Sequence, residues 1–469
     1  MGKYYLAVDI GASSGRHILG HLENGKIKLE EIYRFENGMD HKDGKLLWNV
    51  DRLFGEILNG MKKCKELGKI PVSMAIDTWA VDYVLLDEQD RILGETYGYR
   101  DHRTDGMDAE TAKILQETEL YARTGIQKQI FNTVYQLMAV KQQTPELLQR
   151  AKTLLMLPDY FGFRLTGNKL SEYTNGSTTQ LVNPTTFQWD TDLIRKLGYP
   201  EDIFLPLQMS GTKVGQLLPE IQKEVGFNLE VVLCGSHDTA SAVMAVPQTE
   251  GDGIYISSGT WSLMGIESLK PIINKDAAAA NFTNEGGYDH RFRFLKNIMG
   301  LWMIQSVRHE YNDAYSFAQL CEMAEDSRDF PSRVDVNDPS FLSPDSMVEA
   351  IKKYCQKTGQ PVPESVGELA SVVYRSLAQS YGETVSSLEK IAGRTYDSIH
   401  IIGGGSNAAY LNQLTADATG KTVYAGPGEA TAIGNLLAQM IYAEELTDLK
   451  SARQCVRDSF EIKTFVPAK

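Results

Sequence analysis

Two short stretches, about half the chain apart, share one pattern: a strand, a turn of small residues and a second strand. The first reads AVDIGASSGR over residues 7–16, and the second reads GIYISSGTWSLMGI over 253–266. Three positions align at a constant offset of 248 residues: Gly11, Ala12 and Ser14 with Gly259, Thr260 and Ser262. In a chain of 469 residues, this offset is expected from two halves of one ancestral fold.

Both halves alternate strand patterns with amphipathic helical patterns, among them long helical stretches at 366–392 and 429–445. A break rich in Pro, Gly and acidic residues falls at 245–253. We therefore predict an α/β protein with two domains, residues 1–246 and 247–469. Each domain should contain a mixed sheet flanked by helices, and the two sheets should face each other across a cleft.

Several local patterns refine this prediction. The Asn24-Gly25 pair predicts a hairpin between two strands. Residues 72–93 read as strand, tight corner and strand. The segment 231–246 reads as a buried strand followed by a short helix that opens at Ser236 or Asp238.

Composition limits the possible partners and the cellular compartment. The net charge of −14 argues against a broad nucleic-acid or anionic-membrane surface. No apolar stretch approaches the roughly 18–20 residues of a membrane span. The five cysteines are scattered without a C-x-x-C pair, which is typical of a reducing compartment. We expect a cytoplasmic protein that is a monomer or a small homo-oligomer.

The two small-residue turns suit phosphate binding. A turn whose N–H groups point to one place forms an anion-binding nest, and small residues let a phosphate approach it. Asp9 directly precedes the first turn. Because a carboxylate repels phosphate, Asp9 fits such a site only through a divalent cation, and Mg²⁺ takes one or two carboxylates together with phosphate oxygens. The alternative is a hairpin in which Asp and Gly simply form the turn.

The stretch GSHDTASA places Asp238 in the first turn of a helix. There it either complements the helix dipole or acts as the general base that accepts a hydroxyl proton during phosphoryl transfer. His237 beside it either hydrogen-bonds a polyol or is an ordinary packing residue.

Two further stretches allow both a ligand-binding and a structural interpretation. In DTWAVDYVLLD, Asp77, Thr78, Trp79 and Asp82 form a cluster that suits a sugar, although Trp79 suits a core equally well. In LKNIMGLW, Asn297 lies in an apolar run, where its amide needs partners in the protein or in a ligand.

Taken in order along the chain, several motifs resemble the FGGY family of carbohydrate kinases, within the wider group of actin-like ATPases. They are VDIGASSGR, IDTWAVDYVLLD, SHDTASA, SSGTWSLMG, NEGG, LKNIMGLW, IIGGGSNA and GPGEATAIGN. The resemblance spans nearly the whole chain and implies two actin-like, ribonuclease H-like domains. It also implies ATP and Mg²⁺ as cofactors, and transfer of a phosphoryl group to the C1 hydroxyl of L-rhamnulose.

The resemblance assigns roles to individual residues. The ATP phosphates are assigned to Ala12, Ser13, Ser14, Gly15 and Arg16, with Thr260 from the other domain. Other nucleotide contacts are assigned to Gln305 and Gly404. The sugar is assigned to Ala80, His237, Asp238, Thr239 and Asn297, with Asp238 as proton acceptor.

One position departs from the family pattern T-W-G-V-D, because Ala80 stands where the glycine is expected. Its methyl group could reshape the sugar pocket, so another ketose, L-fuculose or D-xylulose, remains an alternative substrate. An actin-like ATPase without a sugar substrate and a catalytically silent sugar-binding regulator are further alternatives. An NAD-dependent dehydrogenase is excluded because G-x-G-x-x-G is absent.

Overall fold

The structure is a computed structural model that describes residues 2–248 and 253–468. It contains two compact units between which the chain passes several times. The first unit comprises Met1–Ala245, Glu267–Phe294 and Thr431–Ser459, and the second comprises Val246–Ile266, Leu295–Ala430 and Phe460–Lys469. Each compact unit is made of three separate segments of the chain. The division into domains 1–246 and 247–469 therefore stays a prediction. Residues 249–252 of the predicted break lie outside the described residues.

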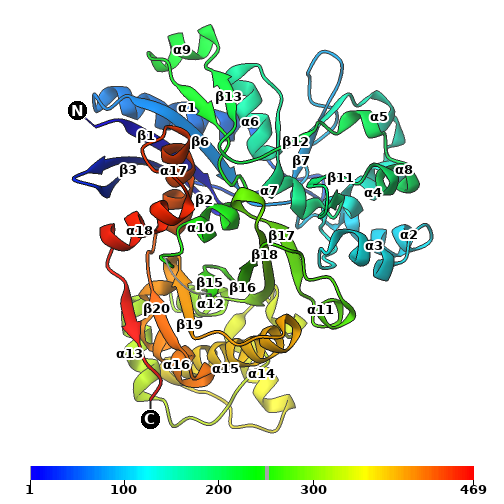
Figure 1. Cartoon of the computed structure of the whole chain (residues 1–469). Coiled ribbons are helices and arrows are strands. Elements are labelled where there is room, and N and C mark those ends of the chain that lie inside the picture. Colours follow the sequence, from blue (N-terminus) through cyan, green and yellow to red (C-terminus); the bar gives the residue numbers. More distant parts are fainter. Residues whose placement is uncertain (1, 249–252, 469) are drawn as a thin grey trace. The chain divides into compact units, whose positions relative to one another are not determined.

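The first unit is built on a six-stranded mixed sheet, in which the hairpin β1–β2 lies next to two parallel strands (Figure 1). Its strand order is β13-β14-β6-β1-β2-β3. These strands are β1 (Tyr4–Ile10), β2 (Ser14–Glu23), β3 (Lys26–Glu36), β6 (Pro71–Thr78), β13 (Lys213–Gln216) and β14 (Glu230–Val232). The predicted turn at Asn24-Gly25 joins β2 to β3, and both of its residues have positive φ, at 52° and 75°.

The alternation of side chains along β1 decides which residues face the site. Leu6, Val8 and Ile10 pack into the core that contains residues of α1 (Val50–Glu66) and α6 (Leu157–Thr166). Tyr5 and Ala7 point the other way and pack against α17 (Ala430–Tyr442). Because successive side chains of a strand alternate between its faces, Asp9 lies on the same face as Tyr5 and Ala7.

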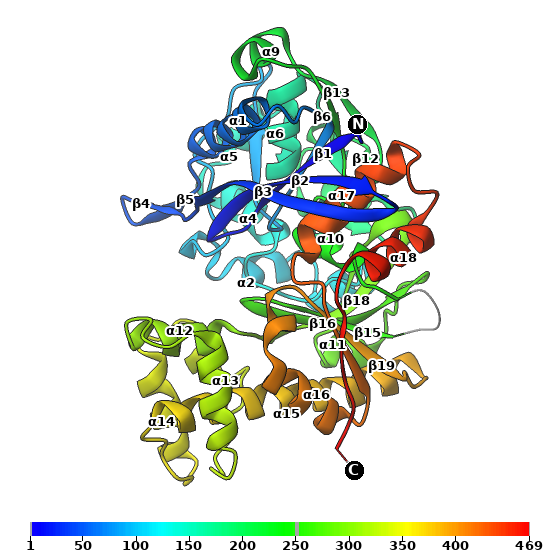
Figure 2. The same cartoon turned by 90° about the vertical axis from the view of Figure 1, so that its left-hand side faces the viewer.

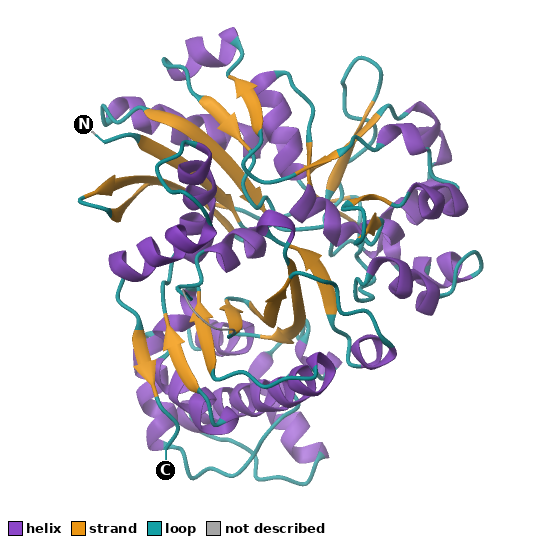
Figure 3. Cartoon of the chain, in the orientation of Figure 1, coloured by secondary structure: helices purple, strands orange, loops and turns teal. Residues whose placement is uncertain are grey.

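The sheet of the second unit repeats this arrangement (Figure 3). Strand β15 pairs antiparallel with β16 and parallel with β19, β19 pairs parallel with β20, and β20 pairs antiparallel with β21. These strands are β15 (Ile254–Ser258), β16 (Trp261–Ser268), β19 (Ser398–Ile402), β20 (Thr422–Ala425) and β21 (Lys463–Phe465). Strand β1 is related in the same way to β2, β6, β14 and β13. The internal repeat predicted from the two hairpins is therefore confirmed in the strand pairing.

The two hairpin turns differ in length by one residue. In the first hairpin Ile10 pairs with Gly15, and in the second Ser258 pairs with Ser262. The offset between equivalent positions is thus 248 before the turn and 247 after it. The predicted match of Ser14 with Ser262 is wrong for this reason, and Ser262 corresponds to Gly15.

Helices surround both sheets, and in the second unit α13 and α16 both pack on the long helix α15 (Figure 2). The predicted helix at 366–392 coincides with α15. The second unit contains α12 (Trp302–Glu310), α13 (Phe317–Asp326), α14 (Met347–Lys357), α15 (Val366–Ala392) and α16 (Ala409–Thr419). The remaining helices are α2 (Met107–Ala112), α3 (Glu117–Thr124), α4 (Thr133–Gln143), α5 (Pro145–Arg150), α7 (Tyr173–Gly176), α8 (Thr191–Leu197), α9 (Pro219–Val225), α10 (Asp238–Met244), α11 (Lys275–Ala279) and α18 (Leu449–Ser459).

The remaining strands are mostly short. They are β4 (Asp40–Lys42), β5 (Lys45–Leu47), β7 (Tyr83–Leu86), β8 (Thr153–Met156), β9 (Ser171–Glu172), β10 (Val182–Asn183), β11 (Gln188–Trp189), β12 (Leu207–Gln208), β17 (Thr283–Gly286) and β18 (Phe292–Met299). In the part of the chain that the structure describes, no helix has both the length and the apolar character needed to cross a membrane.

Candidate active site

The turn of the first hairpin is tied down by Asn37. The N–H of Gly11 donates to the carbonyl of Ser14 at 2.9 Å, and Asn37 Nδ2 donates to the carbonyl of Gly11 at 2.8 Å. The tip residue Ser13 remains exposed. The turn is therefore held in one conformation while its tip stays accessible.

Packing explains part of the small-residue pattern in this hairpin. A Cβ atom on Gly15 would lie 2.1 Å from Cζ of Phe35, so the ring of Phe35 occupies the space of a side chain. Ala12 packs against the same core. Gly15 is thus required by its neighbour within the sheet, independently of any phosphate.

Arg16 and Asp9 form an ion pair across the hairpin. They are paired residues of β1 and β2, and Arg16 donates from Nε and Nη2 to Oδ2 of Asp9 at 3.0 and 2.9 Å. The resemblance assigns Arg16 to the phosphates, and Asp9 is predicted to lie near the metal. The structure brings these two residues together.

A second aspartate lies beside Asp9. Strands β1 and β6 run parallel with Asp9 opposite Asp77. Asp77 is fully buried; its Oδ2 accepts a hydrogen bond from Asn435 of α17 at 2.6 Å, and its Oδ1 accepts none from the described residues. Burial raises the pKa of Asp77 well above its usual value, and the carboxylates of Asp9 and Asp238 raise it further. The carboxylates of Asp9, Asp77 and Asp238 thus concentrate negative charge in one place.

The segment before Asp238 is fixed by a buried carboxylate. Glu172 accepts hydrogen bonds from the N–H and the hydroxyl of Ser236, at 3.3 and 2.7 Å. Ser236 in turn accepts a hydrogen bond at its carbonyl from the N–H of Thr78, at the end of β6. These contacts hold the start of α10 beside the end of β6, which also carries Asp77.

Helix α10 begins at Asp238, with His237 as its N-cap, so of the two predicted starting residues Asp238 is the correct one. Oδ1 of Asp238 accepts hydrogen bonds from the N–H and hydroxyl of Thr239 at 2.6 and 3.1 Å, and Nε2 of His237 lies 3.3 Å from it. Oδ2 of Asp238 accepts no hydrogen bond from the described residues. Burial raises the pKa of Asp238, the neighbouring His237 opposes this, and Asp9 adds to it. One anchored oxygen and one free oxygen suit a proton acceptor.

The tryptophan corner is part of the core. The rings of Trp48 and Trp79 pack at a centroid distance of 4.0 Å and are tilted by 35°, and both indole N–H groups donate to Oδ2 of Asp82. Burial raises the pKa of Asp82 to about 6, against the opposing effect of its hydrogen bonds. Because Asp82 and Trp79 satisfy each other's polar groups, the structural interpretation of both residues is favoured over sugar binding.

Ala80 lies on a strained turn at this corner. The N–H of Asp82 donates to the carbonyl of Ala80 at 2.9 Å, and Val81 between them has φ of 67°. This is a γ-turn, which is unfavourable for a β-branched residue. The carbonyl of Val81 accepts hydrogen bonds from Thr133 and Gln136 of α4, which hold the turn in place. Ala80 itself is partly exposed.

In the second unit, the predicted nucleotide residues lie on neighbouring segments. Thr260 is exposed at the tip of the hairpin β15–β16, and its carbonyl accepts a hydrogen bond from the N–H of Trp302 at the start of α12. Gln305 lies in the first turn of the same helix. A Cβ atom on Gly405 would lie 1.9 Å from Oγ of Ser258, so the glycine turn after β19 packs directly on this hairpin.

Gly404 and Asn297 have features consistent with ligand contact. A Cβ atom on Gly404 would meet nothing within 4 Å, so protein packing does not require a glycine there. Oδ1 of Asn297, on β18, is buried and accepts no hydrogen bond from the described residues. Buried amide oxygens are nearly always satisfied, which favours the ligand-binding interpretation of Asn297.

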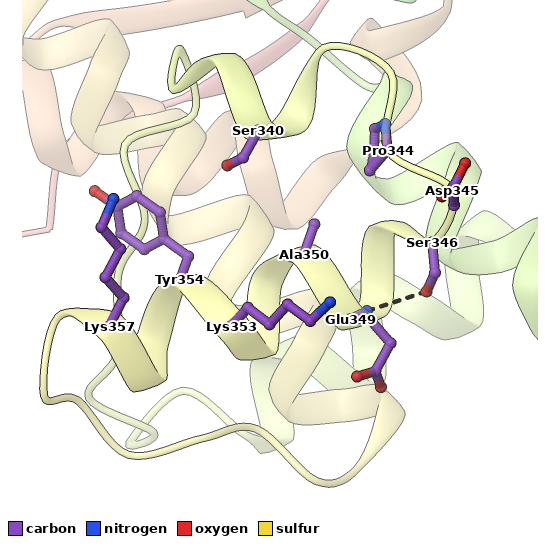
Figure 4. A pocket seen from close by; sticks show the side chains of 9 residues that line it. All are labelled: Ser340, Pro344, Asp345, Ser346, Glu349, Ala350, Lys353, Tyr354 and Lys357. Carbon is purple, nitrogen blue, oxygen red and sulfur yellow. Dashed lines mark hydrogen bonds between the residues drawn. The ribbon is translucent and has the colours of Figure 1, made fainter.

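A cavity of about 430 Å³ lies beside α14 in the second unit, away from these residues in the sequence (Figure 4). Ser346, Glu349, Lys353, Tyr354 and Lys357 line it, and the hydroxyl of Ser346 accepts the N–H of Glu349 at the helix start. None of the predicted site residues lines this cavity.

The sequence did not reveal the roles of several residues that shape the site. Asp77 was predicted to belong to a sugar-binding cluster, although a carboxylate at the end of a strand beside that of Asp9 is a usable signal for a cation. Glu285 lies in the quoted NEGG motif. Asn435 ends the GPGEATAIGN motif, but its partner Asp77 lies 358 positions away, and Arg293 lies outside all of these motifs.

Solved structures of similar fold are sugar and polyol kinases. The structure matches that of xylulose kinase from Lactobacillus acidophilus with a TM-score of 0.80 and 15% identity, covering 99% of this chain and 94% of that one. It matches glycerol kinase from Plasmodium falciparum with a TM-score of 0.79 and 14% identity, over 99% and 94% of the two chains. The chain thus has the fold of this class of kinases, and the α/β prediction with two mixed sheets is confirmed.

Comparison of sequences identifies the family. Residues 4–245 match the N-terminal domain of the FGGY family of carbohydrate kinases, and residues 254–443 match its C-terminal domain. The chain belongs to the FGGY family of carbohydrate kinases. It is 54% identical to rhamnulokinase from Halalkalibacterium halodurans over 466 residues, which is 99% of each chain. It is 46% identical to rhamnulokinase from Bacillus subtilis, over 99% of this chain and 95% of that one.

Proposed function

We propose that this protein is a rhamnulokinase, which transfers the γ-phosphoryl group of ATP to the C1 hydroxyl of L-rhamnulose and yields L-rhamnulose 1-phosphate and ADP. Identity of 54% over 99% of both chains to a protein of that name supports the substrate. The observation that carries the chemistry is Asp238, whose Oδ1 is anchored while Oδ2 is assigned no donor among the described residues.

In the proposed reaction, Oδ2 of Asp238 accepts the proton of the C1 hydroxyl. The C1 oxygen forms a bond to the γ-phosphorus, the bond between that phosphorus and the bridging oxygen breaks, and ADP leaves. Such transfers depend mainly on positioning and electrostatics. We assign sugar contacts to Ala80, His237, Thr239 and Asn297.

We assign the nucleotide to residues of both units. The phosphate contacts are Ala12, Ser13, Ser14, Gly15, Arg16 and Thr260. The other nucleotide contacts are Gln305 and Gly404. The exposed positions of Ser13, Thr260 and Gly404 support these assignments.

The carboxylates of the first unit fit Mg²⁺. Oδ1 of Asp77 is a buried oxygen without a hydrogen bond from the described residues, and Asp9 lies opposite it on β1. Within the described residues, no three His, Cys, Asp or Glu side chains are arranged to hold a metal by themselves. The proposed site therefore has two carboxylates, since Mg²⁺ takes one or two carboxylates together with phosphate oxygens and waters. Asp9 and Asp77 would hold the ion, which when bound supplies charge neutralisation on the phosphates.

The decisive experiment compares Asp238→Asn with the unchanged enzyme in a coupled assay of ADP release. We expect kcat with L-rhamnulose to fall by about 10²–10⁴-fold, the usual contribution of a general base, while L-rhamnulose binding largely persists. Asp192→Asn is a matched control, because Asp192 also lies in the first turn of a short helix and is an exposed residue. Near-normal turnover of Asp238→Asn would contradict the assigned role.

The same assay separates the alternative substrates. L-rhamnulose should be preferred over L-fuculose and D-xylulose, and a different order would reassign the substrate within the family. ATPase activity that no ketose stimulates would favour an actin-like ATPase instead. Binding of a ketose without ADP release would favour a regulator.

We further infer a cytoplasmic enzyme, since its nucleotide substrate is cytoplasmic. All five cysteines are free thiols in the structure, which suits a reducing compartment. A monomer or a small homo-oligomer is proposed, and light scattering coupled to size-exclusion chromatography would distinguish the two.

A further inference from the structure

The first unit buries an arginine beside the residue that precedes the proposed base. The side chain of Arg293, on β18, is completely buried. Its Nη2 lies 3.0 Å from Oε2 of Glu285 and 3.0 Å from Nδ1 of His237, and its Nε donates to the carbonyl of Gly286 at 2.9 Å. Glu285 Oε2 also lies 3.4 Å from Nδ1 of His237. Three ionisable side chains therefore meet in a region closed to solvent.

This arrangement is costly for stability and therefore calls for an explanation. Burying an ion pair removes two charges from water, and packed apolar side chains of the same volume are often equally stable or more so. In addition, Nη1 of Arg293 is buried and has no hydrogen-bond partner among the described residues. The position of Arg293 thus leaves one of its donor groups without a partner but brings another, Nη2, to His237.

The contact with Arg293 selects one tautomer of His237. A guanidinium group can only donate hydrogen bonds and stays protonated in proteins. Nδ1 of His237 must therefore be the acceptor, which leaves the ring proton on Nε2. Burial acts to raise the pKa of Glu285, but the positive charge of Arg293 acts against it and the pKa lies below its usual value, so Glu285 is ionised and balances the arginine.

The Nε2 atom of His237 lies beside the proposed base. Nε2 lies 3.3 Å from Oδ1 of Asp238, the oxygen that also accepts both hydrogen bonds from Thr239. Both hydrogen bonds from Thr239 and the contact with Nε2 fall on the same carboxylate oxygen. They fix the rotation of the carboxylate and turn Oδ2 away from its anchors.

We propose that Arg293 and Glu285 are positioning residues for the phosphoryl transfer: Arg293, balanced by Glu285, holds His237 as the Nε2–H tautomer, and this N–H orients Asp238 so that Oδ2 receives the proton of the sugar hydroxyl. This inference rests on the proposed function for its catalytic consequence. Its structural part, the tautomer of His237, does not depend on any substrate.

The first test is spectroscopic and uses the intact protein. Two-bond ¹H–¹⁵N correlation spectra of protein labelled at its eight histidines distinguish Nε2–H from Nδ1–H imidazole, and loss of one signal in His237→Asn assigns the residue. We expect the unchanged protein to show His237 as Nε2–H at neutral pH. An Nδ1–H or doubly protonated ring would overturn the proposal.

The second test replaces the ion pair by apolar residues of similar volume, in the double variant Arg293→Met with Glu285→Leu. We expect a mixture of His237 tautomers and a kcat lower by about 10- to 100-fold, as for other small misplacements of a reacting group. KM for ATP should stay within about twofold, since neither residue is assigned to the nucleotide. Unchanged kcat in a folded double variant would overturn the proposal.

A matched control removes another enclosed ion pair of the chain. Lys421 and Glu389, in the second unit, lie 2.7 Å apart with side chains 12% and 20% exposed. The double variant Lys421→Met with Glu389→Leu should leave both the spectrum of His237 and kcat unchanged, and an equal loss of kcat in both double variants would also contradict a specific role.

The two proposals can fail separately. If the unchanged protein phosphorylates another ketose, kcat is measured with that ketose and the test of the positioning residues is unaffected. If it phosphorylates none, the proposed function fails, and the tautomer spectra of the unchanged protein and the double variant still decide the structural part. The spectrum of the unchanged protein also decides it if the double variant does not fold.

Discussion

Replacing Gly434 by alanine tests the close contact between helix α17 and helix α10, which carries Asp238. Gly434 lies in α17, where this helix crosses α10. A Cβ atom there would lie 1.7 Å from the backbone carbonyl oxygen of Ser241 and 2.4 Å from its carbonyl carbon. Because the obstacle is backbone, no side-chain rotation can relieve it. Raising the shorter distance to 3.0 Å, about the minimum seen for real Cβ atoms, requires a relative movement of at least 1.3 Å.

That movement falls on the elements that carry the proposed site. Ser241 lies in α10, three residues after Asp238, and Asn435, which holds Asp77, follows Gly434 directly. Overpacking of this kind destabilises a protein by about 1–3 kcal/mol. A displacement of about 1 Å at a reacting group lowers the rate by about 100-fold. We therefore expect Gly434→Ala to fold with reduced stability and to lose about two orders of magnitude in kcat.

Urea denaturation and the coupled ADP assay measure the two effects in Gly434→Ala. Gly55→Ala is the matched control, because Gly55 lies inside helix α1 and a Cβ atom there meets nothing within 4 Å. Alanine should stabilise that helix by about 0.5–1 kcal/mol without changing kcat. If Gly434→Ala kept the stability and the kcat of the unchanged protein, the close contact between α17 and α10 would be refuted.

Three other predictions concern pH, metal and substrate preference. Burial lowers the pKa of His17 from 6.5 to about 4, so between these pH values the unfolded chain binds a proton that the folded protein excludes. Roughly 3 kcal/mol of stability should therefore be lost as the pH falls from 6.5 to 4. Urea denaturation across this range should detect the loss in the unchanged protein and find it absent in His17→Leu. Removal of divalent cations with EDTA should abolish ADP release, and addition of Mg²⁺ should restore it. Asp9→Asn should raise the Mg²⁺ concentration needed for half-maximal rate by about tenfold. Activity that resists EDTA would contradict the metal assignment. Ala80→Gly should lower the preference for L-rhamnulose over L-fuculose by about tenfold, the effect of one methyl group in a pocket. The preference is measured as the ratio of the kcat/KM values for the two sugars. An unchanged ratio would show that Ala80 does not contact the sugar.

Short-range patterns carried most of the correct fold prediction. The hairpin at Asn24-Gly25 and the helix at 366–392 follow from turn preferences and periodicity. Capping preferences limited the start of α10 to Ser236 or Asp238, and the structure selects Asp238. The internal repeat was recognisable because both halves keep the same small-residue turn, although the one-residue difference between the turns was visible only in the strand pairing.

The interpretation of the tryptophan corner depended on contacts outside the motif. In sequence, Trp79 and Asp82 resemble parts of a sugar site. In the structure the two residues hydrogen-bond each other, and Trp48, from a different segment, completes the cluster. Sequence alone did not distinguish the two interpretations, because the partner that decides between them is more than thirty residues away.

The amino-acid sequence was enough to establish the α/β architecture, the family and the position of Asp238 in the first turn of a helix, since these depend on neighbouring residues. The pairing of Asp9 with Asp77, the support of Asp77 by Asn435 and the burial of Arg293 against His237 arose from packing between segments distant in the chain. Register and helix docking are set by the whole core, and a buried charge finds its partner only once that core has formed.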